Sequence, residues 1–251
     1  MQFRVLGKTG LNVSTIGYGA LKIGRNQGMK YPQAFDLPDE ADSGRLLNSC
    51  LDLGINYIDT ARAYGLSEER IGKAIAQRRR EYVLSSKAGE IFENGQSRYD
   101  YSPAALRASV QTSLSLLRTD AIDLLFIHTK DDLHVQNHTE AVPTFQAMKA
   151  AGLARFIGLS AKTPAGAEQA LTWADVLMVE YNFEDRAIEP VVAKALEQGV
   201  GIVVKKGLGS GHLPADQSIA FVLSKAGVSS LIVGSLNLEH LKHNFAIAER
   251  T

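Results

Sequence analysis

Eight short apolar runs recur along the chain, and they constrain its fold more strongly than any other feature. Each run is rich in β-branched residues and ends at small or polar residues. Most are too uniformly apolar to alternate with solvent, which is typical of strands covered on both faces in a parallel sheet. The runs occupy residues 14–19, 56–60, 82–87, 123–128, 155–160, 176–182, 201–206 and 230–234.

Amphipathic stretches with helical spacing separate these runs, for example at residues 46–53 and 188–196. Ser67, which precedes two glutamates, and Ser102, which precedes a proline, indicate helix starts. No Pro/Ser-rich linker and no shift in composition interrupts the alternation of strand and helix. We therefore predict one α/β domain over residues 1–251, built as a (β/α)8 TIM barrel.

The segment FRVLGKTGLNVST precedes the first run and predicts two short strands with a turn at residues 8–10. We expect this N-terminal hairpin to cap the floor of the barrel, which is a packing role. Further along the chain, the three arginines at 78–80 are typical of a solvated helix end.

The charges of the chain are balanced, with 27 Lys and Arg against 27 Asp and Glu. No net field would hold the protein on a nucleic acid or on an anionic membrane, so we expect neither partner. No apolar run approaches the roughly 18 residues that would span a bilayer, and the first residues lack the layout of a signal peptide. We therefore predict a cytoplasmic protein.

The sequence does not predict a metal site. Cys50 is the only cysteine, so it can form neither an internal disulfide nor a thiolate cluster, and it is typical of a buried small apolar residue. His128, His134 and His138 lie close together in sequence, but their spacing is not that of a familiar ligand set.

Polar residues follow the apolar runs where the strands are expected to end. They are Asp59, Lys87, His128, Ser160, Glu180 and Lys205. In a barrel of this class the chemistry lies at the carboxyl ends of the strands. Charged groups there are costly to bury unless they are paired, so we expect them to meet across the mouth. We interpret Glu180 as a bridge to a neighbouring lysine or amide rather than as a second acid.

The residue types at this mouth suit proton donation to a carbonyl oxygen. Tyr64 follows Asp59 closely, but a phenol with a pKa near 10 donates its proton poorly at pH 7. An ammonium about 4 Å away contributes on the order of 4 kcal/mol, so we expect Lys87 to bring the pKa of Tyr64 near neutrality. Asp59 would keep the charge on Lys87, and His128 would orient the substrate carbonyl. None of these groups delivers a hydride, so a nicotinamide cofactor is implied.

Three segments, at 56–72, 82–89 and 123–128, resemble the aldo-keto reductases, with NYIDTARAYGLSEERIG as the most specific motif. The opening residues 6–24 and the closing residues 232–244 are also similar to that family. The resemblance therefore covers essentially the whole chain, in the right order.

This resemblance implies a catalytic tetrad of Asp59, Tyr64, Lys87 and His128. Tyr64 would be the general acid in reduction and the general base in oxidation. The resemblance also implies an NADP-dependent barrel without a Rossmann domain, which agrees with the lack of a G-x-G-x-x-G motif in the chain.

The resemblance also implies which residues contact the cofactor. They are Gly19, Ala20, Leu21, Asp59, Ser160, Met178, Lys205, Lys206, Gly207, Leu208, Gly209, Ser210, Gly211, Gly234, Ser235, Asn237, His240 and Asn244. We expect residues 207–211 to offer backbone N–H groups to the pyrophosphate, with Lys205 and Lys206 as counter-charge.

Five positions depart from the common family pattern. Lys205 stands where many members stack a tyrosine on the nicotinamide, although other members also carry a lysine there. Ala161 and Met178 stand where an asparagine and a glutamine are common at the nicotinamide amide. Gly234 replaces a usual lysine, and His240 replaces the arginine that forks onto the 2′-phosphate. Because a neutral imidazole is a weaker partner for a phosphate than a guanidinium, we predict NADPH with only a moderate preference over NADH.

Substrate specificity is expected in three loops over the mouth, at residues 23–42, 89–101 and 129–138. We expect their aromatic side chains to wall an apolar pocket and their acidic and histidine side chains to supply polar contacts. These side chains are Tyr31, Phe35, Phe92, Tyr99, Tyr101, Asp131, Asp132, His134 and His138. The loop after the seventh strand is short, at about 212–217, which predicts an open cofactor cleft.

We therefore predict an NADP-dependent oxidoreductase that reduces an aldehyde or ketone, or oxidises the corresponding alcohol or sugar lactol. Its partner would be this small carbonyl substrate, and the protein would be a monomer or a weak homo-oligomer. Two alternatives stay open. The same barrel could bind the cofactor as a sensor or regulatory subunit, or it could be an isomerase or lyase that uses Lys87 as a Schiff-base amine.

Overall fold

A closed barrel of parallel strands forms the centre of the structure, a computed structural model that describes residues 2–28 and 31–251. Each barrel strand pairs with the next, and β12 closes the circle by pairing with β3. The barrel strands are β3 (Ile16–Gly19), β4 (Tyr57–Asp59), β5 (Val83–Ala88), β8 (Ile122–His128), β9 (Ala154–Ser160), β10 (Val176–Glu180), β11 (Gly201–Lys205) and β12 (Val228–Val233). Met1, and Met29 and Lys30 of the predicted 23–42 loop, lie outside the described residues.

The predicted barrel is confirmed, and every one of the apolar runs forms one of its strands. The strands are buried along nearly their whole length, as uniformly apolar runs require. Their register also positions the polar strand ends: Asp59 is paired with Ser85, and His128 with Ser160. The carboxyl ends of β4, β5, β8 and β9 therefore form a continuous rim at one end of the barrel.

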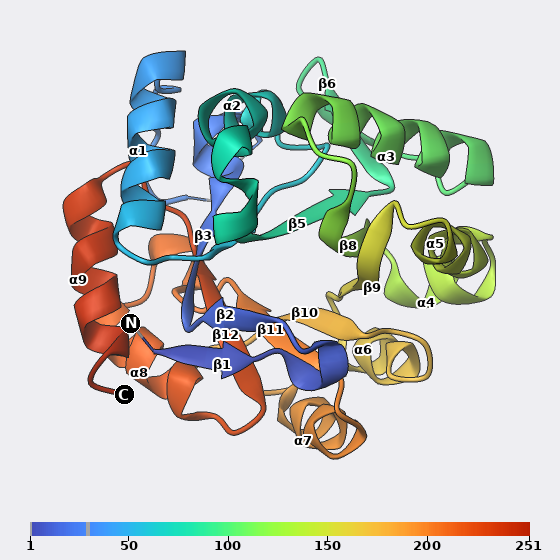
Figure 1. The fold of residues 1–251 in the computed structure, drawn as a ribbon. Coiled ribbons are helices and arrows are strands. Elements are labelled where there is room, and N and C mark those ends of the chain that lie inside the picture. The colour runs from blue at the N-terminus through green and yellow to red at the C-terminus, as the bar shows by residue number, and fades with distance from the viewer. Residues whose placement is uncertain (1, 29–30) are drawn as a thin grey trace.

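The helices form a ring around the barrel (Figure 1). They are α1 (Glu40–Asp52), α2 (Ser67–Ile75), α3 (Pro103–Leu117), α4 (Asp132–Asn137), α5 (Ala141–Ala150), α6 (Pro164–Ala170), α7 (Glu189–Gln198), α8 (Ala215–Ser224) and α9 (Leu238–Ala248). Short 3-10 turns occur at η1 (Gly7–Thr9), η2 (Ala20–Ile23), η3 (Ala76–Glu81) and η4 (Gly209–Gly211). Cys50 lies on the buried face of α1, as predicted.

Both predicted helix starts are confirmed, although only one of the two serines caps its helix. The Ser102 side chain caps α3 by accepting a hydrogen bond from the N–H of Ala105. Ser67 is instead the first residue inside α2, and its hydroxyl donates to the carbonyl oxygen of Ala20 at 2.9 Å and accepts from Thr60 at 2.8 Å. Ser67 therefore ties α2 to the β3 and β4 loops, a contact between distant segments that local sequence does not reveal.

The N-terminal hairpin closes the floor of the barrel, as predicted. Its strands β1 (Phe3–Val5) and β2 (Asn12–Ser14) pair antiparallel and cross one end of the barrel in Figure 1. Leu6, Leu11 and Val13 are buried and pack with side chains of the barrel interior, Phe126 among them. The floor is therefore sealed by apolar packing, which leaves the opposite end of the barrel for chemistry.

An ion cluster built around a buried carboxylate lies beside this floor. Asp123, near the start of β8, pairs with Arg79 at 2.7 Å and with Arg155 at 2.8 Å, and it accepts a hydrogen bond from the N–H of Leu84 at 2.9 Å. The interpretation of residues 78–80 as a solvated helix end is therefore wrong for Arg79 and holds only for Arg80, which is exposed. Arg79 is drawn inward because the Asp123 carboxylate, 5% exposed, needs a partner.

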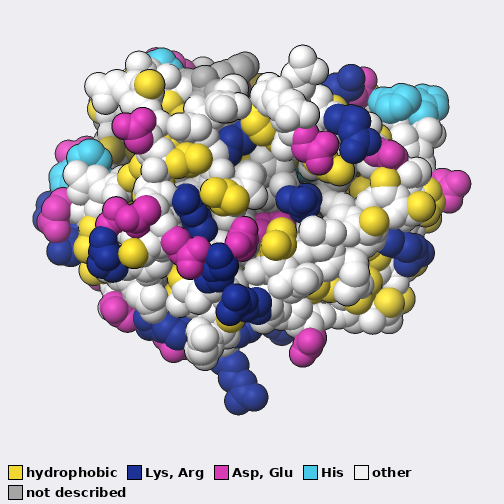
Figure 2. Space-filling view, turned by 90° about the horizontal axis from the view of Figure 1, so that it is seen from above, with side chains coloured by type: hydrophobic (Ala, Val, Ile, Leu, Met, Phe, Trp, Pro, Cys, Tyr) yellow, Lys and Arg dark blue, Asp and Glu magenta, His cyan; other side chains and the backbone are white. Residues whose placement is uncertain are grey.

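Figure 2 views the molecule over α1, α2 and α3, and acidic and basic side chains are interspersed on this face. Ion pairs also join the elements of this region: Lys73 of α2 pairs with Glu40 of α1 and with Glu69, and Arg78 of η3 pairs with Asp52 of α1. Neither sign of charge dominates the face. Separately, in the part of the chain that the structure describes, no helix combines the length and the apolar character needed to cross a bilayer.

Candidate active site

A buried ion pair lies at the mouth, between the ends of β4 and β5. Lys87 Nζ donates to both carboxylate oxygens of Asp59 and to the carbonyl oxygen of Thr60, each at 2.7 Å. Ser85 donates a further hydrogen bond to Asp59 Oδ1 at 2.7 Å. Burial alone would lower the pKa of Lys87, but Asp59 and Tyr64 outweigh this effect and the pKa is raised. Lys87 is therefore held as an ammonium, as expected from the sequence.

Tyr64 is fixed over this ion pair by the loop that joins β4 to α2. The loop turns tightly at Gly65, whose φ is 59°, and a Cβ on Gly65 would lie 2.3 Å from the carbonyl oxygen of Gly24. The N–H of Leu66 donates to that same carbonyl oxygen at 3.1 Å. Only glycine permits this contact between two loop backbones. With the loop held in this way, the centroid of the Tyr64 ring lies 4.8 Å from Lys87 Nζ.

The predicted acidity of Tyr64 is wrong in direction. Burial raises the pKa of Tyr64 above its ordinary 10, and the ammonium of Lys87 lowers it by less. The carboxylates of Asp59 and Glu90 raise it as well. Desolvation of the phenolate therefore exceeds the attraction of one ammonium. The phenol keeps its proton at pH 7 and is available as a proton donor.

His128 ends β8 and completes the group. Its ring meets the Tyr64 ring edge-on, with the centroids 6.1 Å apart and the planes at 85°. Burial lowers the pKa of His128 well below its usual 6.5, and the charges of Lys87 and Lys205 lower it further. The imidazole is therefore neutral at pH 7. The structure thus brings together all four residues that the sequence proposed for catalysis.

Two charged residues at the mouth were missed from the sequence. Glu90 begins β6 (Glu90–Glu93), which forms a hairpin with β7 (Gln96–Tyr99), and its Oε2 lies 3.1 Å from His128 Nδ1. Arg25 stacks on Phe92, with its guanidinium carbon 3.2 Å from the ring centroid, and its Nη1 lies 3.9 Å from Glu90 Oε1. The sequence signalled Glu90 only as a glutamate three positions after Lys87. Because it lay in a predicted loop, the direction of its side chain could not be predicted.

A groove of about 390 Å³ opens beside the loops that follow β11 and β12. The predicted cofactor residues that line it are Lys206, Gly207, Leu208, Ser210, Gly211, Gly234 and His240. Its other lining residues are Lys22, Tyr31, Pro32, Gln33, Ile232 and Val233. The cleft that was predicted to be open is therefore walled on one side by the segment after β3. Tyr31, predicted at the substrate mouth, belongs to this groove.

The turn at residues 207–211 offers fewer free N–H groups than predicted. The N–H groups of Gly209 and Gly211 donate to the carbonyl oxygens of Lys206 and Leu208, at 2.8 Å each. These two N–H groups are therefore already used within the protein. Lys206 Nζ lies 2.5 Å from Glu180 Oε1, so Glu180 bridges a lysine as interpreted from the sequence. The short loop that follows is also shorter than expected, because α8 already begins at residue 215.

Ser160 and Lys205 meet across the barrel mouth, with Lys205 Nζ donating to Ser160 Oγ at 2.9 Å. Burial lowers the pKa of Lys205 to about 7, although Glu180 opposes the shift. Met178 is almost fully buried in the barrel interior, with its sulfur 3.7 Å from Ser160 Oγ. Ser160 and Lys205 therefore form a polar surface beside the tetrad, on the side of β9 and β11. Lys205 is only partly charged at pH 7.

Other predicted cofactor residues lie at the end of β3 and just after it, and at the start of α9 and within it. Gly19 ends β3, and Ala20 and Leu21 follow it in η2. Ser235 and Asn237 hold the start of α9: Ser235 Oγ accepts from the N–H of Asn237, and Asn237 Oδ1 accepts from the N–H of Glu239. Asn244 is buried on α9. None of these residues lines the groove.

Two of the predicted substrate loops carry regular structure. The 89–101 segment contains the β6–β7 hairpin, and the 129–138 segment contains α4. Asp131 caps α4 by accepting from the N–H of His134, and Asp132 is buried and accepts from the N–H groups of Lys162 and Thr163. These two carboxylates are therefore committed to the fold, and the prediction that they contact substrate is not supported. His134 and His138 lie exposed on and after α4.

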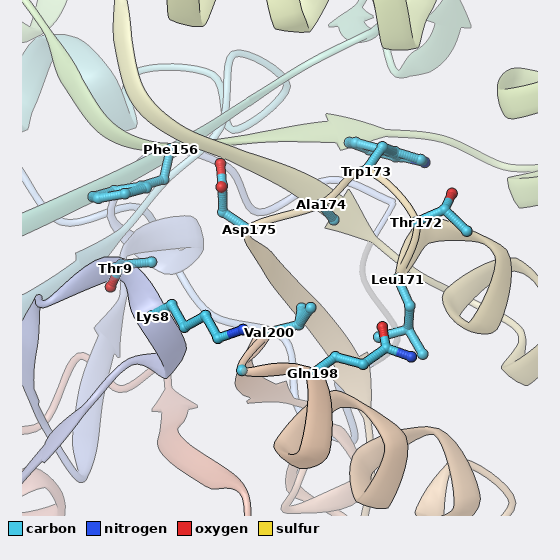
Figure 3. A pocket seen from close by; sticks show the side chains of 11 residues that line it. Lys8, Thr9, Phe156, Leu171, Thr172, Trp173, Ala174, Asp175, Gln198 and Val200 are labelled. Carbon is cyan, nitrogen blue, oxygen red and sulfur yellow. The ribbon is translucent and has the colours of Figure 1, made fainter.

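A second cavity, of about 290 Å³, lies at the opposite end of the barrel (Figure 3). It is bounded by the hairpin turn at Lys8 and by Phe156, Trp173 and Asp175. The Asp175 carboxylate pairs with Lys149 at 2.7 Å, and Trp173 Nε1 donates to Gln136 at 2.9 Å, so these polar groups are paired within the protein. Within residues 2–28 and 31–251, no cluster of three or more His, Cys, Asp or Glu side chains is placed to hold a metal ion.

Comparison with known proteins gives a consistent picture over most of the chain. A family model described as "Aldo/keto reductase family" matches residues 15–219. The uncharacterized oxidoreductase YqkF of Bacillus subtilis is 27% identical over 296 aligned positions, which cover 99% of this chain and 91% of that protein. L-galactose dehydrogenase of Arabidopsis thaliana is 29% identical over 232 positions, which cover 85% of this chain and 67% of that protein.

Solved structures of similar proteins share the barrel. A protein of Pseudomonas aeruginosa assigned to the aldo-keto reductases is 43% identical and superimposes with a TM-score of 0.91, covering 99% of this chain and 95% of that chain. The holo form of aldo-keto reductase AKR11C1 from Bacillus halodurans is 27% identical, with a TM-score of 0.86, covering 100% of this chain and 92% of that chain.

Proposed function

The chain belongs to the aldo/keto reductase family of oxidoreductases, and we propose that it is an NADP(H)-dependent member that interconverts a carbonyl compound and its alcohol. The observation that carries this proposal is the buried Asp59–Lys87 ion pair, with the Tyr64 ring 4.8 Å from Lys87 Nζ. A protonated phenol beside a permanently charged ammonium suits the transfer of one proton to a developing alkoxide.

Tyr64 is the general acid in reduction. As its proton moves to the substrate oxygen, the phenolate that remains is stabilised by the ammonium of Lys87, because that ammonium stays charged beside Asp59. In oxidation Tyr64 acts as the phenolate: it first releases its own proton to solvent and then accepts the proton of the alcohol. When bound, the nicotinamide supplies or accepts the hydride. His128, neutral and edge-on to Tyr64, orients the substrate without competing as the acid.

The low exposure of the site to water strengthens the electrostatic interactions within it. The side chains of Lys87 and Asp59 are 2% and 5% exposed, so water screens their charges very little. An ammonium in such surroundings stabilises a nearby oxyanion more strongly than it would in water. The fixed positive charge of Lys87 therefore offsets part, though not all, of the free-energy cost that burial imposes on a Tyr64 phenolate.

The groove beside the mouth fits the phosphate-bearing part of the cofactor. Lys22 and Lys206 bring positive charge to it, and Gly211 and Gly234 leave its walls without side chains. We place the nicotinamide end at Ser160 and Lys205, which adjoin the tetrad. These assignments rest on the resemblance to the family and on the chemistry of the lining residues.

His240 is the groove residue that bears on cofactor choice. An imidazole is a weaker partner for the 2′-phosphate than the arginine of related enzymes, so we expect only a moderate preference for NADPH over NADH. The ratio of kcat/KM for the two cofactors measures this preference. A ratio above about a thousandfold, or roughly 4 kcal/mol, would contradict the proposal for His240.

The names of similar proteins suggest where to look for the substrate. They include L-galactose dehydrogenase, D-threo-aldose 1-dehydrogenase and pyridoxine 4-dehydrogenase. We propose an aldehyde, a ketone or a sugar lactol as the substrate. The experiment is NADPH oxidation at 340 nm against a panel of aldehydes, ketones and sugars, with NADP⁺ reduction for the alcohols. Cofactor binding without turnover of any compound would favour a binding protein on the same barrel.

A further inference from the structure

The close approach of Glu90 to His128 is produced by the turn between β5 and β6. Gly89 occupies this turn with a φ of 115°, and a Cβ there would lie 2.8 Å from the carbonyl oxygen of His128 and 2.9 Å from the Tyr101 ring. The chain therefore passes close against the end of β8 as it leaves Lys87. The next residue, Glu90, is carried to the ring of His128, where its Oε2 lies 3.1 Å from Nδ1.

The carboxylate of Glu90 is held from its other side. The hydroxyl of Ser97, across the hairpin, donates to Glu90 Oε1 at 2.5 Å, and Arg25 Nη1 lies 3.9 Å from the same oxygen. The Glu90 side chain is 10% exposed. A donor and a cation therefore occupy Oε1, which leaves Oε2 as an acceptor facing the imidazole.

His128 Nδ1 depends on this acceptor. The atom is fully buried and, among the residues that the structure describes, has no partner in hydrogen-bonding geometry. Glu90 Oε2, 3.1 Å away, is the acceptor within reach of it. A neutral imidazole carries one proton on two nitrogens, and a carboxylate beside Nδ1 stabilises the form with the proton there.

We propose that Glu90 is a positioning residue, which keeps the ring proton of His128 on Nδ1 and leaves Nε2 as a hydrogen-bond acceptor at the mouth. The proposal rests on the reductase function proposed above. Nδ1 is buried, whereas the His128 side chain as a whole keeps 16% of its surface exposed. Tyr64 is then the donor to the carbonyl oxygen, and Nε2 accepts from a hydroxyl group on the neighbouring carbon. Hydroxyaldehydes and open-chain sugars carry such a hydroxyl, whereas simple aldehydes do not.

The position of the ring proton can be measured directly. Long-range ¹H–¹⁵N correlation spectra of protein labelled with ¹⁵N-histidine distinguish the two tautomers, and a His128→Gln variant assigns the signal. We expect the Nδ1–H form in the wild-type protein and a shift toward Nε2–H in Glu90→Ala. Glu93→Ala is the matched control, because Glu93 is exposed on the same hairpin. The same tautomer in the wild type and in Glu90→Ala would overturn the proposal.

Kinetics give a second readout. The ratio of kcat/KM for glycolaldehyde to that for acetaldehyde is expected to fall at least tenfold in Glu90→Ala, because a site built to bind a hydroxyl rejects the analogue that lacks it. Glu90→Gln keeps an acceptor oxygen and is expected to stay within about threefold of the wild-type ratio. The dissociation constant of NADPH, from quenching of protein fluorescence, should not change in either variant, which excludes a general loss of structure.

The outcomes separate this inference from the function on which it rests. If the wild-type protein turns over no carbonyl compound, the reductase function itself fails. If it does so and Glu90→Ala leaves both the ratio and the tautomer unchanged, only the role of Glu90 fails. If Glu90→Ala does not fold, Ser97→Ala releases Oε1 of the same carboxylate, and a smaller change in the same direction is expected; no change would count against the proposal.

Discussion

The two ends of the barrel each hold a buried carboxylate that pairs with basic side chains, and they use it differently. At the floor, Asp123 is paired with Arg79 and Arg155. Arginine does not lose its charge in proteins, and the contacts of this cluster stay within the fold. At the mouth, Asp59 is paired with Lys87, whose ammonium also lies beside the phenol of Tyr64.

The difference lies in what surrounds the ion pair rather than in its burial. The two carboxylates are equally buried, each 5% exposed. The floor surrounds its carboxylate with donors of fixed charge and so stabilises one structure. At the mouth, the ammonium of Lys87 lies near two groups that can exchange protons, Tyr64 and His128. A neighbouring tyrosine alone does not separate the two ends, because the Tyr82 ring lies 5.2 Å from the Arg79 guanidinium at the floor. What the mouth adds is a lysine and a histidine beside the same phenol.

The largest expected effect is at the mouth. Tyr64→Phe removes the proton donor and should lower kcat about a thousandfold, since positioned acid–base groups contribute up to roughly four orders of magnitude. NADPH oxidation at 340 nm measures the loss, and the affinity for NADPH should stay close to that of the wild type. Tyr82→Phe at the floor is the control, because the Tyr82 hydroxyl has no hydrogen-bond partner within the described part of the chain. Equal turnover in Tyr64→Phe would remove Tyr64 from the mechanism.

The reverse pattern is expected at the floor. Asp123→Ala leaves Arg79 without its carboxylate and should lower the free energy of unfolding by roughly 3 kcal/mol, while kcat of the folded protein stays within about twofold. Urea unfolding and steady-state kinetics on the same sample test both parts. Asp120→Ala, at an exposed position nearby, should change stability by less than about 0.5 kcal/mol. A loss of kcat without a loss of stability in Asp123→Ala would break the comparison between the two ends.

The mouth should also respond to pH in a way that the floor does not. The pKa of Lys205 is about 7 in the folded protein, against 10.5 ordinarily, so between these values the unfolded chain binds more protons. Stability should therefore rise with pH through this window, by about 2 kcal/mol between pH 7 and pH 9 for this one group. Urea unfolding at pH 7, 8 and 9 measures the slope, and Lys205→Met should flatten it. An identical slope in that variant would mean that Lys205 titrates normally.

The smallest expected effect concerns the cofactor groove. His240→Arg introduces a guanidinium that can fork onto a phosphate, and it should raise the preference for NADPH over NADH about tenfold, or roughly 1.4 kcal/mol. The ratio of kcat/KM for the two cofactors is the measurement. Lys242→Arg, on the exposed side of the same helix, serves as the control for added guanidinium. A preference that does not change would place His240 away from the 2′-phosphate.

Several details of the site depend on the folded chain and could not be read locally. Glu90 is the clearest case, because its place beside His128 follows from the path of the backbone at Gly89. Arg79 and Ser67 were each interpreted from their neighbours in sequence, and each is engaged by a residue far along the chain. The pKa of Tyr64 was also misjudged, because the attraction of one ammonium is simple to anticipate and the degree of burial is not.

The sequence by itself determined the barrel, its capping hairpin and the four residues at the mouth, because apolar periodicity fixes which segments are strands and parallel strands bring their carboxyl ends together. Only the tertiary structure decided how those residues are charged and which neighbours they acquire. Desolvation, the approach of Glu90 to His128 and the wall that Tyr31 and Pro32 add to the groove arise from segments that meet only in the folded protein. Charge states and side-chain directions depend on distance and burial in three dimensions, and neither quantity is local in sequence.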